Sequence, residues 1–544
     1  MKVELYNKIV KAGLTRRGVL KGAASVGALS MIGSMIGAKA AMAQDDLRAQ
    51  LMAIPGVGNG SPTDADWQKV GELCLGGTKA NVAEGEFAGV ELTFFGINNN
   101  GLHNILFRGF LTSWEKYTGA KINWIDLAQA DYNPRLQQSI ATGTVDFDIL
   151  AMGAPLEGDT AGQGLLDEMP EWVAKQIEMD DYVSYLHAPV GTWAGKTYRI
   201  TIDGDCHTFA YRKDYFGEGS ISGMAEAPTT WQGVNAYSAA VKGQKDPLTG
   251  QDAIGYLDPL KGWGGFGFYF LEDRATAYVK YPGNPAWLFE PETMKPMVNN
   301  PGWVQAIQDV MDNIPNMPAD QINADPGTTA FQQFLAGTGS SVCWWGDVGS
   351  NAKTSDSSVV GDVIGFSINP GSEKVYNPTA AAWETPEGGN FAPNMAYLGW
   401  GVYVTNRVSG DEKKRKAAWS AAAHLGGKDI SFWMAAYPSG FQPYRNSHFN
   451  YDEWAAAGYD RAFVEDYLGS NADSYNHPNA AIEPRIPGIF QYYSVAEDEL
   501  AKGYAGTYKS AQETADAIAA AWEKITDQIG RDGQIALYKA SLGM

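Results

Sequence analysis

The sequence predicts an α/β protein with at least two lobes, and three observations support this prediction. Residues 91–150 alternate between short apolar runs rich in β-favouring residues and repeats at helical spacing, which is the rhythm of a parallel α/β lobe. Amphipathic helical stripes recur much later, at 303–314 and 511–529. About 500 residues follow the first 43, and a chain of this length is too long for one hydrophobic core.

The first lobe is predicted element by element from residue 91. A strand covers Glu91–Gly96 and leads into the turn-forming residues 98–101. Apolar residues then recur every three or four positions over 102–117, which predicts a helix that Gly119 ends. A second strand is expected at 121–126, a polar helix at 133–142 and a third strand at 147–150.

Two later helices have clear signals. Trp303, Ile307, Val310 and Ile314 form one helical face. The final helix is expected to begin at Ser510–Glu513, which has the pattern of a capping box, and to end at Gly530. No internal repeat or low-complexity linker separates the segments, so we expect the lobes to be interleaved in sequence.

The first residues resemble an export signal and are set apart from the fold. Thr15–Lys21 contains paired arginines, an apolar run follows over 22–37, and Ala41-Met42-Ala43 has the pattern of a signal-peptidase site. We therefore expect residues 1–43 to be a twin-arginine signal peptide. The run is shorter than the roughly 18–20 residues of a membrane span, and the absence of cysteine here excludes a lipid anchor.

Residues 44–89 are rich in small and polar side chains and have few periodic signals. They are expected to form a partly ordered N-terminal arm.

Charge and composition exclude several classes of function. The chain carries 41 Lys and Arg against 62 Asp and Glu. Residues 1–43 hold seven of the basic and one of the acidic side chains, so 34 basic and 61 acidic remain, a formal charge of about −27. A surface this acidic argues against binding nucleic acid or anionic lipid. No later stretch is apolar enough to span a membrane.

Cysteine and histidine give little support for a metal or cofactor site. The six His show no metal-binding spacing, and no CxxC or dinucleotide-binding GxGxxG motif occurs. We therefore expect no cofactor and no resident metal. Cys74, Cys206 and Cys343 leave open one disulfide plus a free thiol, without indicating the pair.

Several blocks follow one another in the order found in a known family. They cover residues 110–122, 146–149, 195–216, 331–346, 398–404 and 486–493. Two of these blocks are characteristic of that family. One is the Asn-Lys-Asp-like segment Arg212-Lys-Asp-Tyr-Phe216, and the other is Phe331–Gly337 with the strand that leads to Trp345. Together the blocks resemble the family 1 extracellular solute-binding proteins of ABC importers, the group that includes maltose-binding protein.

This resemblance implies a two-lobe periplasmic-binding-protein fold of type II, with hinge strands near 206–211 and 399–404 and a ligand cleft between the lobes. The N-terminal lobe would comprise 90–207 and 399–435, and the C-terminal lobe 208–398 and 436–544. Such a protein closes around its ligand and delivers it to the permease subunits of the importer. We expect a monomer, because no long exposed amphipathic or coiled-coil stripe is present.

The chemistry of a sugar site points to Trp344-Trp345-Gly346-Asp347. Sugars present apolar C–H faces and a rim of hydroxyls, which aromatic rings and carboxylates bind. Adjacent side chains of a strand face opposite ways, so one Trp packs inward while the other can reach the cleft. Asp347 can accept hydroxyl hydrogen bonds or cap the following helix. Trp263, in a Gly-rich loop, is a second candidate.

Further candidates lie at strand ends and at positions matched by the family. Asn98 and Asn99 follow the first strand, where a parallel sheet presents its crevice, although an ordinary turn explains them equally well. Asp203 and Asp205 can bind hydroxyls or calcium, or form a solvated turn. The resemblance adds five positions: Tyr397, Trp400, Tyr444, Arg445 and Tyr492.

The sequence therefore predicts a binding protein for a sugar or polyol rather than an enzyme. Two alternatives remain open. A secreted carbohydrate hydrolase needs the same aromatics and a pair of opposed carboxylates. The same fold can also bind a metal complex, an organic acid or a peptide.

Overall fold

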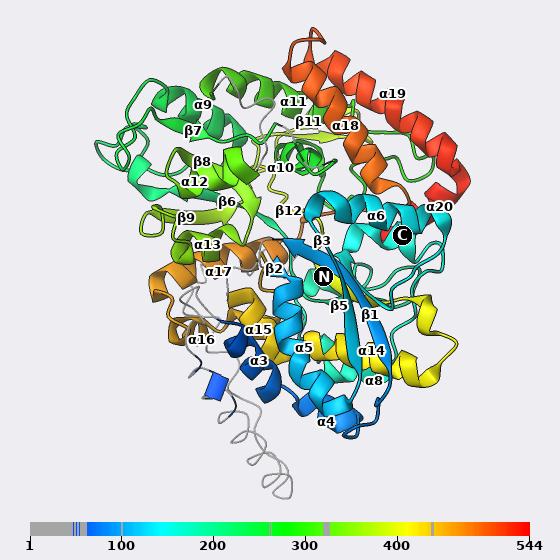
Figure 1. The fold of residues 1–544 in the computed structure, drawn as a ribbon. Coiled ribbons are helices and arrows are strands. Elements are labelled where there is room, and N and C mark those ends of the chain that lie inside the picture. Colours follow the sequence, from blue (N-terminus) through cyan, green and yellow to red (C-terminus); the bar gives the residue numbers. More distant parts are fainter. Residues whose placement is uncertain are drawn as a thin grey trace, which may run out of the picture. The chain divides into compact units, whose positions relative to one another are not determined.

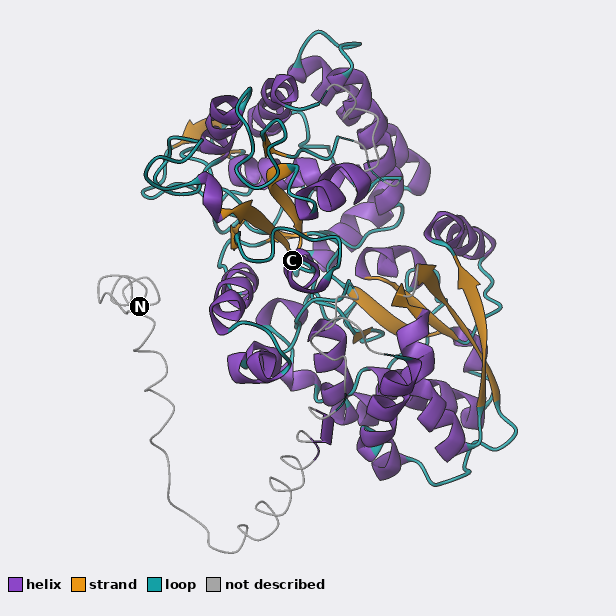
Figure 2. Ribbon diagram, turned by 60° about the vertical axis from the view of Figure 1, so that its left-hand side comes forward, coloured by secondary structure: helices purple, strands orange, loops and turns teal. Residues whose placement is uncertain are grey.

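The described part of the fold contains two larger β-sheets, of six and four strands, each lying among helices (Figures 1 and 2), together with two small sheets of two strands each. The computed structural model describes Leu47, Gln50, Leu51, Ile54 and residues 63–99, 102–260, 262, 264–318, 327–436 and 440–544. The predicted signal peptide, residues 1–43, lies outside the described residues. Ile54–Met544 form one compact unit, which contains both larger sheets.

The first sheet has six strands in the order β2-β1-β4-β13-β5, with β3 also paired to β1. β1, β3 and β4 run parallel, whereas β13 is antiparallel to β4 and β5. The strands are β1 (Glu91–Asn99), β2 (Leu102–His103), β3 (Lys121–Leu127), β4 (Ile149–Gly153), β5 (Ile200–Thr201) and β13 (Trp400–Val404). A segment from the far end of the chain, β13, thus lies in the middle of the N-terminal sheet.

The predicted alternation over 91–150 is present. β1, α5 (Asn104–Thr118), β3, α6 (Gln129–Thr142) and β4 follow in order. Leu106, Phe110 and Trp114 are buried along one face of α5, as their spacing predicts. Gly119 ends that helix at φ +78°, a left-handed conformation that favours glycine.

The second sheet has four strands in the order β7-β8-β6-β9. β7 and β8 are parallel, and β6 is antiparallel to both of its neighbours. The strands are β6 (His207–Arg212), β7 (Ile254–Tyr256), β8 (Gly339–Trp345) and β9 (Ile364–Ile368). The associated helices are α9 (Trp231–Val241), α10 (Gly267–Val279), α11 (Pro301–Asn313), α17 (Arg461–Tyr475), α18 (Ile489–Tyr504) and α19 (Ala511–Ile529).

Further helices and short strands pack around the two larger sheets. They are α7 (Glu157–Thr160), α8 (Glu171–Gln176), α13 (Val348–Thr354), α14 (Glu412–Leu425), α15 (Lys428–Ala436), α16 (Tyr451–Ala456), β10 (Val375–Asn377), β11 (Ala382–Glu384), β12 (Asn394–Met395) and β14 (Ala481–Ile482). α14 packs on α5 and β13, and α17 packs on β9.

Two segments differ from the sequence-based expectation. Within the expected arm, α3 (Asp64–Leu73) and α4 (Gly76–Asn81) form, and α3 packs closely on α5. Thr63 and Asp66 cap α3 reciprocally, while Trp67 and Val70 are buried. The helix at 511–529 is not the last, because α20 (Arg531–Ser541) follows it. Only half of the predicted capping box is present: the Ser510 hydroxyl accepts from the Glu513 N–H, but the Glu513 carboxylate accepts from the Lys509 N–H rather than from that of Ser510.

The chain passes between the two sheets at separate points. Ile202–Cys206 joins β5 to β6, and Ala396–Gly399 precedes β13. These segments lie against each other: a Cβ on Gly399 would fall 2.0 Å from the Asp203 carbonyl oxygen, and Ile202 N–H donates to the Trp400 carbonyl at 3.0 Å. The lobe boundaries stated above stay a prediction.

Candidate functional site

A cavity of about 420 Å³ lies where residues from both groups of strands meet. It is lined by Gln137, Leu156, Gly264, Phe490, Gln491, Ser494 and Val495. Gln137 is on α6, which follows β3, and Leu156 comes directly after β4. Gly264 belongs to the loop after β7, and the other four are on α18. Open parallel sheets bind ligands beyond the carboxyl ends of their strands, which is where this cavity lies.

Aromatic rings continue from the cavity in an unbroken chain. Phe490 stacks on Phe266 at 5.3 Å between ring centroids, and Phe266 contacts Tyr397 at 5.1 Å. Tyr397 contacts Trp400 at 5.5 Å, and Trp400 contacts Tyr132 of α6 at 6.2 Å. Phe490 and Trp400 each pack against two hydrophobic cores, the one around the six-stranded sheet and the one around the four-stranded sheet. We call these five rings the aromatic wall; Phe490 lines the cavity, while Phe266, Tyr397 and Tyr132 are buried behind it.

Tyr397 is held in this wall by an unusual backbone. Its φ is +71° and that of Leu398 is +52°, values that non-glycine residues seldom adopt. The Tyr397 N–H donates to the buried Glu483 carboxylate at 3.0 Å, and burial raises the pKa of Glu483 to about 8. Gly153 ends β4 beneath the ring, where any Cβ would fall 2.0 Å from it. Strained backbone of this kind is common at binding sites.

The loop over 262–267 is fastened to α18 by one carboxylate. Glu497 accepts hydrogen bonds from the backbone N–H groups of Gly262 (2.8 Å), Gly265 (2.8 Å) and Gly267 (3.2 Å). Trp263, the predicted candidate in this loop, lies outside the described residues. Its neighbour Gly264 lines the cavity.

The two tryptophans at the end of β8 do not separate to opposite sides as strand alternation predicted: their rings pack edge to face at 5.4 Å, and both contact Phe270. Trp344 is 5% exposed and stacks between Phe270 and Phe331, at 5.4 and 5.1 Å. Trp345 is partly exposed and reaches Phe266 at 6.2 Å, and its indole N–H donates to the Ala396 carbonyl at 3.4 Å. Trp345 is therefore the one joined to the aromatic wall.

Asp347 directly precedes α13 but makes no side-chain cap there. One carboxylate oxygen accepts from Asn351 at 3.4 Å, and the other has no hydrogen-bond partner among the described residues. Burial raises the pKa of Asp347 to about 7. This carboxyl is available to a further donor.

Asp203 and Asp205 are buried around Gln442. Asp203 accepts from the Gln442 backbone N–H at 2.7 Å, and Asp205 accepts from its side-chain amide. The amide oxygen of Gln442 accepts in turn from the Gly346 N–H at 2.9 Å. Burial raises the pKa of Asp203 to about 8, with the charge of Asp347 adding to the effect. The pKa of Asp205 is raised well above its usual value by burial and by both neighbouring charges.

This acid cluster joins the first crossing, Ile202–Cys206, through Gln442 to the end of β8. No group of three or more His, Cys, Asp and Glu in the described part of the chain has the geometry of a metal site. The alternative of a calcium site at Asp203 and Asp205 therefore gains no support there. Cys206, next to the cluster, is a free thiol, as is Cys343.

Asn98 and Asn99 end β1 and pair with the short strand β2, opposite His103 and Leu102. This places their backbone at the carboxyl end of the strand, as predicted; their side chains lie outside the description.

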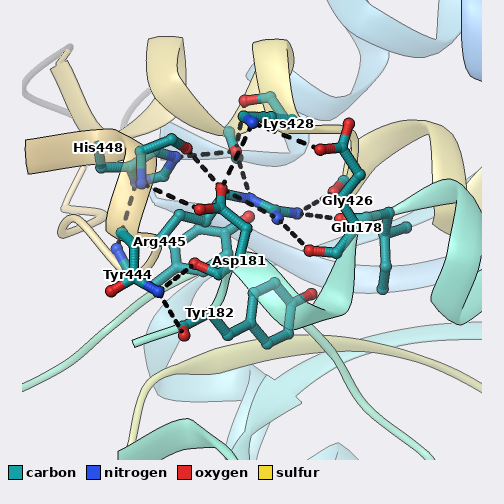
Figure 3. Close-up of polar contacts among 12 residues, drawn as sticks. Glu178, Asp181, Tyr182, Gly426, Lys428, Tyr444, Arg445 and His448 are labelled. Carbon is teal, nitrogen blue, oxygen red and sulfur yellow. Dashed lines mark hydrogen bonds and ion pairs between the residues drawn. The ribbon is translucent and has the colours of Figure 1, made fainter. Parts of the chain in front are cut away.

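Three predicted residues lie elsewhere. Arg445 is fully buried and donates to the carbonyls of Ile177, Glu178 and Gly426, while Tyr444 packs edge-on against Tyr182 (Figure 3). The Tyr492 hydroxyl is bonded to Thr526 of α19 at 2.9 Å, on the face of α18 that packs on that helix. None of the three lines the cavity.

Several residues around the cavity were not predicted. Phe490 and Gln491 lie in a segment that the sequence singled out. Glu483 and Glu497 carry no local signal, because the partners in these bonds are 86 and 235 residues away in sequence. No helix within the described ranges is long and apolar enough to cross a membrane.

Comparisons with known proteins agree on the type of fold. A family model described as bacterial extracellular solute-binding protein matches residues 111–457. No curated protein sequence matches the chain. A solute-binding protein of an ABC transporter from Agrobacterium radiobacter K84, in complex with ribitol, is 19% identical with a TM-score of 0.60, over 81% of this chain and 99% of that one.

Two further solved structures are similar. Maltose-bound MalE3 of T. maritima is 16% identical with a TM-score of 0.60, over 80% of this chain and all of that one. A solute-binding protein from Agrobacterium vitis S4 with bound D-mannitol is 17% identical with a TM-score of 0.58, over 81% and 99%. These likenesses confirm the predicted two-lobe α/β fold.

Proposed function

This chain belongs to the bacterial extracellular solute-binding proteins, and from that premise we propose that it captures a sugar or polyol and delivers it to an ABC importer. The observation that supports this most strongly is the aromatic wall beside the 420 Å³ cavity. Its size falls within the range of small-molecule sites, roughly 300–1,000 Å³. Gln137, Gln491 and Ser494 supply amide and hydroxyl groups for a ligand's hydroxyls.

The ligand class rests on two further arguments. The ligands named for the similar structures are ribitol, maltose and D-mannitol, all uncharged and rich in hydroxyls. The cavity offers the same chemistry, because its described lining holds neither a cation nor a carboxylate. A hydrolase would need two opposed carboxylates there, so the lining favours binding over hydrolysis.

The route and partners complete the proposal. The paired Arg16 and Arg17, the apolar run and Ala41-Met42-Ala43 support export through the twin-arginine pathway to the periplasm. There the protein would act as a monomer that closes on its ligand and is recognised by the permease subunits of the importer.

Two pairs of neighbouring aromatics test the site by calorimetry against a panel of sugars and polyols. Phe490→Ala is expected to weaken affinity by about tenfold or more, because a ring packed on a sugar contributes on the order of 1–3 kcal/mol. Tyr492→Ala, on the same helix, should instead lower stability by about 3–5 kcal/mol. In the second pair, Trp345→Ala should mainly weaken affinity, and Trp344→Ala should mainly lower stability.

The controls are internal to each pair, since each compares a ring near the cavity with a core ring in the same element. Unchanged affinity in both Phe490→Ala and Trp345→Ala would refute the cavity as the ligand site. If no sugar or polyol of the panel binds, the proposed ligand class is wrong.

A further inference from the structure

A second cavity of about 420 Å³ lies apart from the one described above and shares no lining residue with it. Its walls come from residues 184–190, which precede β5, and 475–482, which link α17 to α18. Lys280, at the end of α10, and Leu542, at the end of α20, complete it.

The walls are largely apolar and held in place. Pro189, Val190 and Ile482 contribute aliphatic surface. The rings of Tyr185 and Tyr475 stack at 5.1 Å, and their hydroxyls donate to the Asp205 and Gly204 carbonyls. A ligand would therefore meet a preformed surface, which lowers the entropic cost of binding.

Lys280 brings an uncompensated positive charge to this cavity. The residue is 6% exposed, and its ammonium donates to the side-chain carbonyl of Asn479 at 3.2 Å. No carboxylate in the described ranges lies within ion-pair distance of it. Burial lowers the pKa of Lys280 to about 8, with no opposing acid to raise it. Buried charges are normally paired, so the missing partner calls for an explanation.

His477 adds a neutral donor on the same wall. Burial, and then the charge of Lys280, lower the pKa of His477, so its ring is uncharged near neutral pH. Its Nδ1 accepts from the Asn479 backbone N–H at 3.2 Å, which places the ring proton on Nε2. The polar part of the cavity thus combines a single cation with the His477 N–H and the side chains of Ser184, Asn476 and Ser541. Its described lining holds no Asp or Glu, and most of the other lining residues are apolar.

We propose that this cavity binds a small monocarboxylate with an apolar body, the carboxylate pairing with Lys280. One buried cation matches one negative charge, and a charge-assisted hydrogen bond to an ammonium is among the stronger polar contacts in proteins. The apolar walls would take a chain or ring of about six carbons in a cavity of this size. This site is independent of the proposed capture of a sugar or polyol.

The test titrates the full exported chain with hexanoate by calorimetry, with the isosteric but neutral hexanamide as the comparison ligand. Hexanoate should bind saturably at millimolar concentration, and hexanamide at least about tenfold more weakly. Lys280→Met should cause a loss of similar size. Lys295→Met, which removes an exposed lysine elsewhere, should leave the affinity unchanged.

Two more variants locate the binding. Ala480→Phe fills this cavity without altering the lysine and should abolish hexanoate binding, which keeps the test valid even if Lys280→Met fails to fold. Phe490→Ala should leave hexanoate binding intact, since that ring lines the other cavity. The proposal is overturned if hexanoate does not bind, if hexanamide binds equally well, or if Ala480→Phe binds hexanoate like the unmodified protein.

Discussion

Two buried charged side chains, Arg445 and Asp203, differ in how their polar atoms are satisfied, although Asp203 binds the backbone only three residues before Arg445. Arg445 donates to Ser431 and to three backbone carbonyls at 2.7–3.1 Å. Asp203 has one oxygen bonded to the Gln442 N–H, while its other oxygen has no hydrogen-bond partner within the described structure. Its neighbours Asp205 and Asp347 are also acidic, so their charges repel rather than compensate.

The difference separates a structural cluster from a responsive one. The Arg445 cluster (Arg445 with Ile177, Glu178, Gly426 and Ser431) has a fixed cation whose bonds join the ends of α8 and α14. The acid cluster (Asp203, Asp205, Asp347 and Gln442) can change its charge near neutral pH. It also lies at the crossings between the sheets. A satisfied network stabilises one arrangement, whereas an under-satisfied one leaves room for a second.

The largest expected effect is the loss of Arg445. Arg445→Met should lower the free energy of unfolding by about 3–5 kcal/mol, because it leaves buried carbonyls at two helix ends without donors. Denaturant titration measures the change, and sugar or polyol affinity should be unaffected.

Arg461→Met is the matched control. Arg461 is about half exposed, with a side-chain exposure of 49%, and pairs with Asp452 and Glu465 at the surface. Its loss should cost much less than the loss of Arg445, because an exposed ion pair is screened by solvent. Equal effects of the two substitutions would show that the Arg445 cluster is not the stabilising one.

A smaller effect is expected where the crossings touch. Gly399 has φ +83°, and an added Cβ would fall 2.0 Å from the Asp203 carbonyl oxygen. Gly388 has φ +81° and open space around it. Gly388→Ala should therefore cost only the backbone strain, about 1–2 kcal/mol, and Gly399→Ala a further 1–3 kcal/mol or so from the clash. Thermal and denaturant unfolding of both variants measures the two losses of stability. Equal losses would mean that the two crossings can move apart at Gly399 and that the contact there is not tight.

The sequence predicted the fold where the periodic signal is long. The alternation of strands and helices over 91–150 needs only local patterns, and the burial of Phe110 and Trp114 follows from the same spacing. α3 and α20 were missed because each is short and mostly polar, so that packing on a neighbour rather than an intrinsic pattern stabilises them. The pairing of β13 with β4 depends on contacts between residues some 250 positions apart.

The site could be predicted only in part, for a geometric reason. The block around 486–493 indicated the helix that lines the cavity, but residues two positions apart on a helix point about 200° apart. Phe490 therefore faces the cavity, while Tyr492 is buried against α19. Strand alternation also predicted that Trp344 and Trp345 face opposite ways, but at the end of β8 their rings pack on each other and both contact Phe270. Only tertiary packing decides that Trp345 is the one that reaches the aromatic wall.

The smallest expected effect is a pH dependence that only the acid cluster should show. The folded-state pKa of Asp203, about 8, lies above its value of about 4 in an unfolded chain. The stability contributed by the protonated carboxyl is therefore complete below about pH 4 and is lost as the pH rises through 8. Asp203→Asn keeps an acceptor for the Gln442 N–H but cannot ionise. Between about pH 5 and pH 8, the variant should lose on the order of 2 kcal/mol less stability than the unmodified protein. Denaturant unfolding of the ligand-free proteins across that range measures the difference, with the exposed Asp356→Asn as control. Parallel curves for Asp203→Asn and the unmodified protein would mean that the acid cluster is as fixed in charge as the Arg445 cluster, and the contrast between them would fail.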